Sequence, residues 1–217
     1  MNTPRAQDIR RIFCGDCVVL SPQTAFPHDF LKLETCSGYQ RSSAEVDRGV
    51  EILDKYVPER ILNTPFKHIQ QINLRDQLSL GGLKKAIRLC KNVKADAESD
   101  GAKIDLTSYD IASVLWHADV TALRVGVTYE LAILAEVTRF LDDLVRRETY
   151  ARSLRVPNDS RYIFDTDEKI EGLRLLSLEM DDLSERVARE QAKLLNHLQA
   201  LNRDRIIEEL RKAQVPR

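Results

Sequence analysis

Residues 81–94 read GGLKKAIRLCKNVK, and residues 106–112 read LTSYDIA. In the first stretch apolar side chains recur every three or four residues, a spacing that predicts an amphipathic helix with one buried side. Three cations, Lys84, Arg88 and Lys91, follow the spacing i, i+4 and i+7 and form a row beside the apolar side. The apolar positions are Leu83, Ala86, Ile87, Cys90 and Val93.

The second stretch carries the start of another helix. Thr107 and Asp110 fit a capping box, in which the hydroxyl accepts a hydrogen bond from the backbone three residues on and the carboxylate reaches back. Ser108 and Tyr109 then lie in the first turn, where unpaired N–H groups and the helix dipole favour an anion. Spacing alone leaves two interpretations open, namely a site for a nucleoside triphosphate (NTP) and an ordinary solvated cationic face beside an ordinary helix start.

Three segments, in this order, resemble the second half of bacterial nucleotidyltransferases of the polymerase-beta-like superfamily. Its members include the cyclic-oligonucleotide synthases and, more distantly, the poly(A) and poly(U) polymerases. The resemblance covers about Arg48 to His117, and its segments are NTPFKHI (63–69), the basic stretch extended to residue 96, and IDLTSYDIA (104–112). The resemblance implies a mainly α fold, in which the chain is the C-terminal helical domain of such an enzyme with a short N-terminal strand remnant of the catalytic sheet.

The resemblance also implies particular nucleotide contacts. In that superfamily a lysine on one helix and a Ser-Tyr at the start of the next contact the triphosphate and the base. Carried over to this chain, Lys91, together with Lys84 and Arg88, would contact the phosphates. Ser108 would add a phosphate contact, and Tyr109 would stack on the base.

Enzymes of this superfamily hold two magnesium ions with three carboxylates, two from an Asp-x-Asp after a Gly-Ser turn and a third from a later strand. The run IFCGDCVVLSP, residues 12–22, predicts a buried strand that ends at a turn. Asp16 in this run resembles the third metal carboxylate. The match is loose because Leu20 and Ser21 precede Pro22, where the family has its proline sooner, so an ordinary strand-end aspartate is the alternative.

The other two metal carboxylates have no counterpart, because no Gly-Ser turn followed by Asp-x-Asp occurs in the sequence. We therefore expect a fragment, a truncated product or one half of a split enzyme, inactive alone. With a complete core it would use Mg²⁺ and an NTP to transfer a nucleoside monophosphate to a hydroxyl. The alternative is a noncatalytic helical interaction or regulatory module derived from the family.

Composition sets further limits on function. The 217 residues are 43% hydrophobic and 31% charged with a net charge of -1, so the chain can bury a core but has no bulk attraction to nucleic acid. The sequence shows no membrane span and no secretory signal, and we expect a cytoplasmic location. Cys14, Cys17, His28 and Cys36 are an alternative set of zinc ligands, but their spacing follows no known zinc motif.

The chain is predicted to fall into three stretches. Residues 1–43 would be the remnant of the catalytic core, 44–156 the nucleotide-contacting helical domain, and 157–217 a long C-terminal helix. Residues 122–152 are expected to form one helix with a buried face. Apolar residues from Ile170 to Ile206 predict a single helix that begins at Asp167 and packs on the missing catalytic half or pairs with a second copy in a homodimer.

Overall fold

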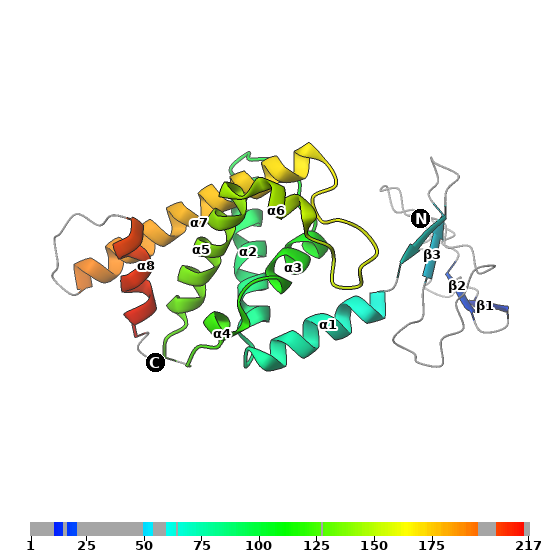
Figure 1. Cartoon of the computed structure of the whole chain (residues 1–217), viewed down its shortest axis with the longest axis horizontal. Coiled ribbons are helices and arrows are strands. Elements are labelled where there is room, and N and C mark those ends of the chain that lie inside the picture. Colours follow the sequence, from blue (N-terminus) through cyan, green and yellow to red (C-terminus); the bar gives the residue numbers. More distant parts are fainter. Residues whose placement is uncertain are drawn as a thin grey trace, which may run out of the picture. The chain divides into compact units, whose positions relative to one another are not determined.

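The computed structural model describes residues 11–14, 17–20, 50–53, 60–63, 65–126, 128–194 and 203–214. The chain divides into two compact units, residues 1–70 and residues 71–217. In the first unit β1 (Arg11–Cys14) pairs antiparallel with β2 (Cys17–Leu20), and β3 (Val50–Leu53) pairs antiparallel with β4 (Arg60–Asn63). Each pair forms a separate two-stranded sheet (Figure 1).

The strands correct two expectations. The run from residue 12 to residue 22 was predicted as one strand, but β1 and β2 are two strands in which Cys14 is the register partner of Cys17. A helical pattern was predicted from residue 44, but β3 and β4 are strands, because a short apolar run such as VEIL satisfies its backbone by pairing and periodicity alone does not distinguish it from a helix. Asp16 lies outside the described residues.

Most of the remaining described residues are helical, which confirms the mainly α fold class. Eight helices follow one another in the described ranges: α1 (Pro65–Leu78), α2 (Gly82–Ser99), α3 (Ser108–Trp116), α4 (Val120–Leu123), α5 (Leu131–Arg146), α6 (Glu148–Ser153), α7 (Asp167–Leu194) and α8 (Arg203–Lys212).

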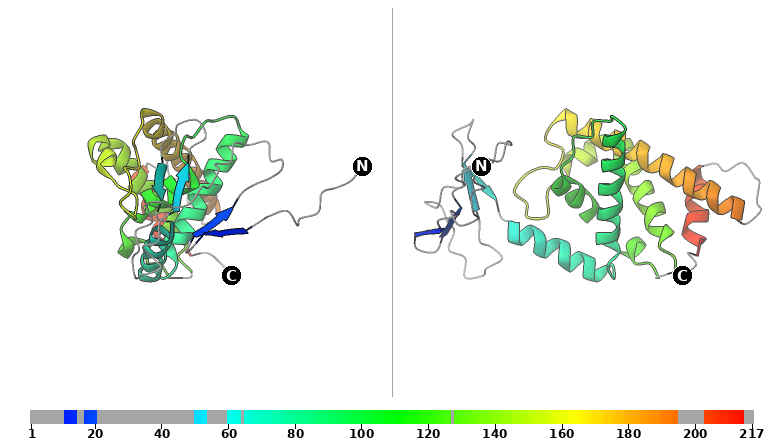
Figure 2. Two further views of the ribbon diagram at one scale, coloured as in Figure 1. Left: turned by 90° about the vertical axis from the view of Figure 1, so that its right-hand side faces the viewer. Right: turned by 180° about the vertical axis from the view of Figure 1, so that it is seen from behind.

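The core of the second unit forms around α5, which packs against α2, α7 and α8, while α2 also packs against α3. The buried side predicted for α2 is confirmed, since Leu83, Ala86 and Cys90 are fully buried and Val93 is nearly so. Cys90 lines a small apolar gap in this core together with Leu141 of α5 and Leu176 of α7. The views of Figure 2 show α2, α5 and α7 side by side.

Two long helices expected from the sequence are shorter in the structure. Residues 122–152 contain the end of α4, then α5 and α6, because Arg147 has a non-helical backbone (φ -112°, ψ 59°) between the last two. The pattern from Asp167 to Ile206 belongs to two helices, α7 and α8. The two helices are separate because α8 packs on both α5 and α7, and it thereby buries Ile206 and Leu210 (Figure 1).

A buried carboxylate on α5 fixes the position of α8. Glu136 is 2% exposed and pairs with Arg139 at 2.5 Å on its own helix and with Arg211 of α8 at 3.5 Å. Because a buried carboxylate is costly without partners, these two arginines compensate its burial. In the described ranges, every helix is too short or too polar to cross a membrane.

Candidate functional site

The N-terminus of α2 is held by a hydroxyl and by a close backbone contact. Ser79 Oγ accepts a hydrogen bond from the Leu83 backbone N–H at 3.0 Å, so it satisfies one N–H of the first turn. A Cβ atom at Gly82 would lie 2.0 Å from the Leu123 carbonyl oxygen. Glycine is therefore required at this position for α2 to approach the end of α4.

The basic row predicted on α2 is present, but its members differ in their surroundings. Lys84 is committed to Asp76, whose carboxylate lies 3.5 Å from Lys84 Nζ and accepts from the Lys84 backbone N–H at 2.9 Å. Arg88 and Lys91 are exposed. Seven residues of helix separate Lys84 from Lys91 by about 10 Å along the axis. The exposed cations therefore lie towards the middle of α2, away from the pair that Lys84 makes.

The start of α3 contains the predicted capping box. The Asp110 backbone N–H donates to Thr107 Oγ1 at 3.1 Å, and Asp110 Oδ2 accepts from the Thr107 backbone N–H at 3.0 Å and from its hydroxyl at 2.7 Å. The Asp110 side chain is fully buried. Burial by itself raises the pKa of this carboxyl, but the hydrogen bonds from Thr107 and Arg161 together bring it below its usual value. Asp110 is therefore a buried carboxylate that its donors keep ionised.

Ser108 and Tyr109, in the first turn of α3, have different environments. Ser108 is exposed, whereas Tyr109 is half-buried. The Arg161 guanidinium lies over the Tyr109 ring, with 5.5 Å between Cζ and the ring centroid. Burial raises the pKa of the Tyr109 phenol, while the Arg161 charge and hydrogen bonding with Asn158 and Ser160 act in the opposite direction. The ring is thus held by the segment between α6 and α7.

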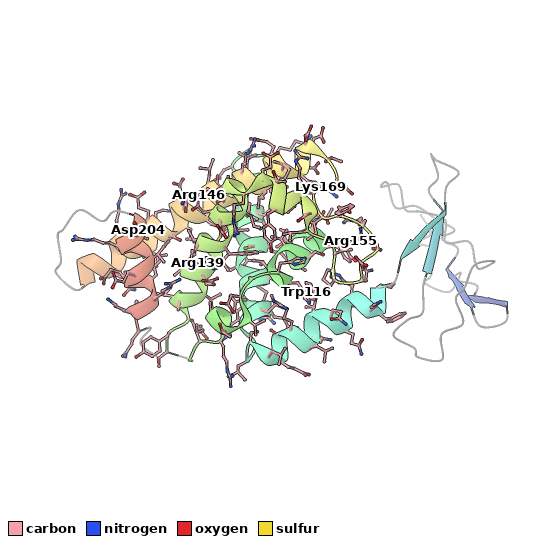
Figure 3. All side chains as sticks on the ribbon, in the orientation of Figure 1. Trp116, Arg139, Arg146, Arg155, Lys169 and Asp204 are labelled. Carbon is pink, nitrogen blue, oxygen red and sulfur yellow. The ribbon has the colours of Figure 1, made fainter. Side chains whose placement is uncertain are left out.

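Asp110 connects this segment to α7. Arg161 Nη2 donates to Asp110 Oδ1 at 2.5 Å, and Lys169 Nζ lies 3.8 Å from the same oxygen and 2.7 Å from Asp165 Oδ1. In Figure 3, Lys169 lies at the N-terminal end of α7 and Arg155 on the segment that precedes it. Neither Arg161 nor Lys169 was predicted as a site residue, because Arg161 contacts Asp110 across 51 positions and no local spacing relates them.

The other end of α3 also pairs cations with aromatic rings. The Arg75 guanidinium lies over Trp116 at 5.0 Å from the ring centroid and donates to the Ala118 carbonyl at 2.9 Å. His117 Nε2 donates to the Arg155 carbonyl at 2.7 Å, which requires the Nε2–H tautomer if the ring is neutral. Burial lowers the pKa of His117, so the neutral form is favoured.

Comparison with known proteins identifies this arrangement of helices. The family model of the cGAS/DncV-like nucleotidyltransferase C-terminal helical domain matches residues 70–184, which include α2, α3 and the segment that carries Arg161. The chain belongs to this family. The resemblance seen in the sequence is thereby confirmed.

Relatives of this CD-NTase C-terminal domain are cyclic dinucleotide synthases. The chain is 45% identical over 141 residues to the cyclic dinucleotide synthase CdnE of Yersinia aleksiciae, in a match that covers 64% of the chain and 37% of that protein. It is 35% identical over 103 residues to a c-di-GMP synthase of Capnocytophaga granulosa, which covers 46% of the chain and 28% of that protein. The chain therefore spans less than half of the length of either relative.

Solved structures agree with the assignment to the CD-NTase family. The STING-associated CdnE c-di-GMP synthase from Capnocytophaga granulosa superposes with a TM-score of 0.58 at 29% identity, over 67% of this chain and 47% of that one. The Rhodothermus marinus CdnE c-UMP-AMP synthase, solved with Apcpp and Upnpp, superposes with a TM-score of 0.52 at 19% identity, over 75% of this chain and 51% of that one. The second likeness concerns the fold alone.

The described part of the CD-NTase domain does not gather the side chains of a metal centre. No group of three or more His, Cys, Asp or Glu side chains in the described ranges could hold a metal ion. Asp16, predicted as a magnesium ligand, and the alternative zinc ligands His28 and Cys36 lie outside those ranges, as do the side chains of Cys14 and Cys17. The metal site expected from the sequence therefore stays a prediction.

Proposed function

We propose that this chain is the nucleotide-contacting helical part of a nucleotidyltransferase that transfers a nucleoside monophosphate from an NTP to a hydroxyl. The observation that carries the proposal is the family match over residues 70–184, because it includes the basic row of α2 and the Ser108-Tyr109 turn of α3. Since the Yersinia relative is named a cyclic dinucleotide synthase, we further propose that the acceptor hydroxyl belongs to a second nucleotide.

Each side chain has a proposed role that fits its environment. Tyr109 stacks on the base, since its ring is half-buried and restrained by Arg161. The Ser108 hydroxyl donates a hydrogen bond to a phosphate at the positive end of α3. The exposed Arg88 and Lys91 supply positive charge to the phosphates. Lys84 contributes less, because a phosphate contact would compete with its ion pair to Asp76.

The metal chemistry is assigned to a catalytic core. When bound, magnesium ions would activate the attacking hydroxyl and neutralise charge on the transferred phosphate. The described residues do not form such a site. We propose that Asp16 supplies one carboxylate, that a catalytic half supplies the others, and that the 217-residue chain alone is inactive.

Two further parts of the proposal concern the setting of the protein. We place the chain in the cytoplasm, where NTPs are available. We also propose that two copies can pair through the C-terminal helices, where α7 exposes Leu178. Sedimentation of the purified chain tests the pairing, and a single monomeric species across a hundredfold range of concentration would contradict it.

The nucleotide site is tested by calorimetric binding of ATP, GTP, CTP and UTP to the 217-residue chain. We expect measurable binding, weakened about tenfold by Lys91→Ala and by Ser108→Ala, because each change removes one charge-assisted phosphate contact. Lys212→Ala is the matched control, since this exposed lysine of α8 pairs with Glu208. The Lys212→Ala variant should bind each NTP with the affinity of the wild type. Failure of the wild-type chain to bind any of the four NTPs would favour the noncatalytic helical module.

A further inference from the structure

Arg161 is the residue through which the segment between α6 and α7 reaches the start of α3. The ends of this segment are closed by backbone hydrogen bonds, from the Ile163 N–H to the Leu154 carbonyl at 3.0 Å and from the Val156 N–H to the Arg161 carbonyl at 3.1 Å. These bonds make the segment a short antiparallel hairpin, which we call the 154–163 hairpin. Arg161 therefore approaches α3 from a hydrogen-bonded support.

The 154–163 hairpin restrains Tyr109 at two places. The Arg161 guanidinium covers the ring, at 5.5 Å between Cζ and the centroid. The phenol oxygen is buried, and Asn158 and Ser160 of the hairpin lower its pKa, against the effect of burial. Asn158 is itself 6% exposed, and its Oδ1 accepts from the Ser160 hydroxyl at 2.9 Å and backbone N–H at 3.3 Å. Side chains of this hairpin thus act on both the ring and the hydroxyl of Tyr109.

The terminal nitrogens of Arg161 are already engaged within the protein. Nη2 donates to Asp110 Oδ1 at 2.5 Å, and Nη1 donates to the Tyr162 carbonyl at 3.0 Å and lies 3.7 Å from Asp165 Oδ2. A guanidinium that binds a phosphate presents paired N–H groups to it. Because the Nη groups of Arg161 point to protein oxygens, this arginine is suited to orient Tyr109 rather than to contact a phosphate.

We propose that Arg161 is a positioning residue for the nucleotide base. It fixes the ring of Tyr109, and the base stacks on that ring. The 154–163 hairpin is then part of the nucleotide site, although it is far from α3 in the sequence. This inference rests on the proposed function, since it concerns the same base contact. A restrained ring strengthens base binding because less side-chain freedom is lost when the base stacks.

The test compares a nucleotide with inorganic tripolyphosphate, which carries phosphates but no base. Arg161→Gln should weaken ATP binding to the 217-residue chain about fivefold, as expected for a lost cation–π restraint, and leave tripolyphosphate binding unchanged. Tyr109→Ala should show the same pattern, and the double variant should bind ATP no more weakly than Tyr109→Ala, because Arg161 acts through the ring. Arg189→Gln, an exposed arginine of α7 paired with Glu185, is the matched control.

A second readout follows the contact without any nucleotide. Since the Arg161 charge stabilises the phenolate, its removal should raise the pKa of Tyr109 further. The absorbance of phenolate near 295 nm measures this pKa as the difference between each protein and its Tyr109→Phe counterpart. Arg161→Lys keeps a charge for Asp110 and should restore thermal stability, whereas ATP affinity should recover only in part because the planar guanidinium is absent.

Each outcome separates the inference from the proposed function. Equal weakening of ATP and tripolyphosphate by Arg161→Gln would overturn the positioning role, since it would indicate a direct phosphate contact. Additive losses in the double variant would overturn it as well. If Tyr109→Ala abolishes ATP binding and Arg161→Gln leaves it intact, only this inference fails. If the wild-type chain binds no NTP, the proposed function fails and the inference falls with it.

Discussion

Replacement of Asp110 by asparagine tests whether the start of α3 holds the helical unit together. The Asp110 carboxylate is fully buried and accepts from the Thr107 backbone N–H, the Thr107 hydroxyl and Arg161 Nη2. Asparagine has nearly the same shape, but its amide offers one acceptor oxygen where the carboxylate offers two. Its NH₂ group would then face a donor, so at least one of these hydrogen bonds is lost.

The expected loss of stability follows from these contacts. Loss of half of the capping box costs about 1 kcal/mol, and loss of a buried hydrogen bond to a charged acceptor costs about 1.5–3 kcal/mol. Arg161 is 35% exposed, so it can turn towards water and adds little penalty for an unpaired cation. We therefore expect Asp110→Asn to lower the free energy of unfolding by about 2–4 kcal/mol, which corresponds to roughly 4–16 °C in Tm for a unit of this size.

Urea denaturation followed by circular dichroism measures this difference, and its dependence on pH checks the cause. The folded pKa of Asp110 lies below the ordinary value of 3.8, so the stabilisation is fully present above that value and is lost as the pH falls through the folded pKa. The difference between wild type and Asp110→Asn should therefore be constant from pH 7 to about pH 5 and shrink below about pH 4.

Asp159→Asn is the matched control for this experiment. Asp159 is 75% exposed and pairs with Arg155, and asparagine tolerates its positive φ of 60°. This variant should unfold at the same urea concentration as the wild type, within error. A loss of under 0.5 kcal/mol for Asp110→Asn at pH 7, or an effect no larger than that of Asp159→Asn, would refute the role assigned to the buried carboxylate.

Two further predictions concern the core around α2. Gly82→Ala should lower the free energy of unfolding by about 1–3 kcal/mol, because the added methyl would overlap the Leu123 carbonyl. Gly126→Ala, whose Cβ would lie 3.6 Å from Tyr129, is the control, and equal melting temperatures for both variants would contradict the close approach of α2 to α4. Burial raises the pKa of the Cys90 thiol to about 12, so iodoacetamide at pH 8 should leave Cys90 unmodified in the native chain and modify it in urea. Peptide mass spectrometry measures both states, and native labelling as fast as that in urea would show that Cys90 is accessible.

Much of the second unit could be predicted from local patterns. The buried side of α2 follows from apolar residues at helical spacing, and the capping box of α3 follows from Thr107 and Asp110 three residues apart. Both features depend only on residues close together in the chain, so the local sequence is sufficient to predict them. The family resemblance rests on the same segments, and the match over residues 70–184 confirms it.

Local patterns failed where they predicted one helix and the structure has two. One helix was expected from Asp167 to Ile206, but α8 is a separate helix that buries Leu210 against α5 and α7. Periodicity is the same for one long helix and for two helices that pack together, since both place apolar residues on one side. Which of them forms depends on the surface that α5 offers, and this surface exists only in the folded unit.

The basic row of α2 and the Ser108-Tyr109 turn follow from the sequence, because helical spacing and capping are local. Which of these residues stay exposed depends on the tertiary structure. It pairs Lys84 with Asp76 and leaves Arg88 and Lys91 exposed. It also brings Arg161 onto Tyr109 and Asp110 from 51 residues away in the chain, and an ion pair over that separation forms only when the packing of α3 and the 154–163 hairpin buries the carboxylate between them.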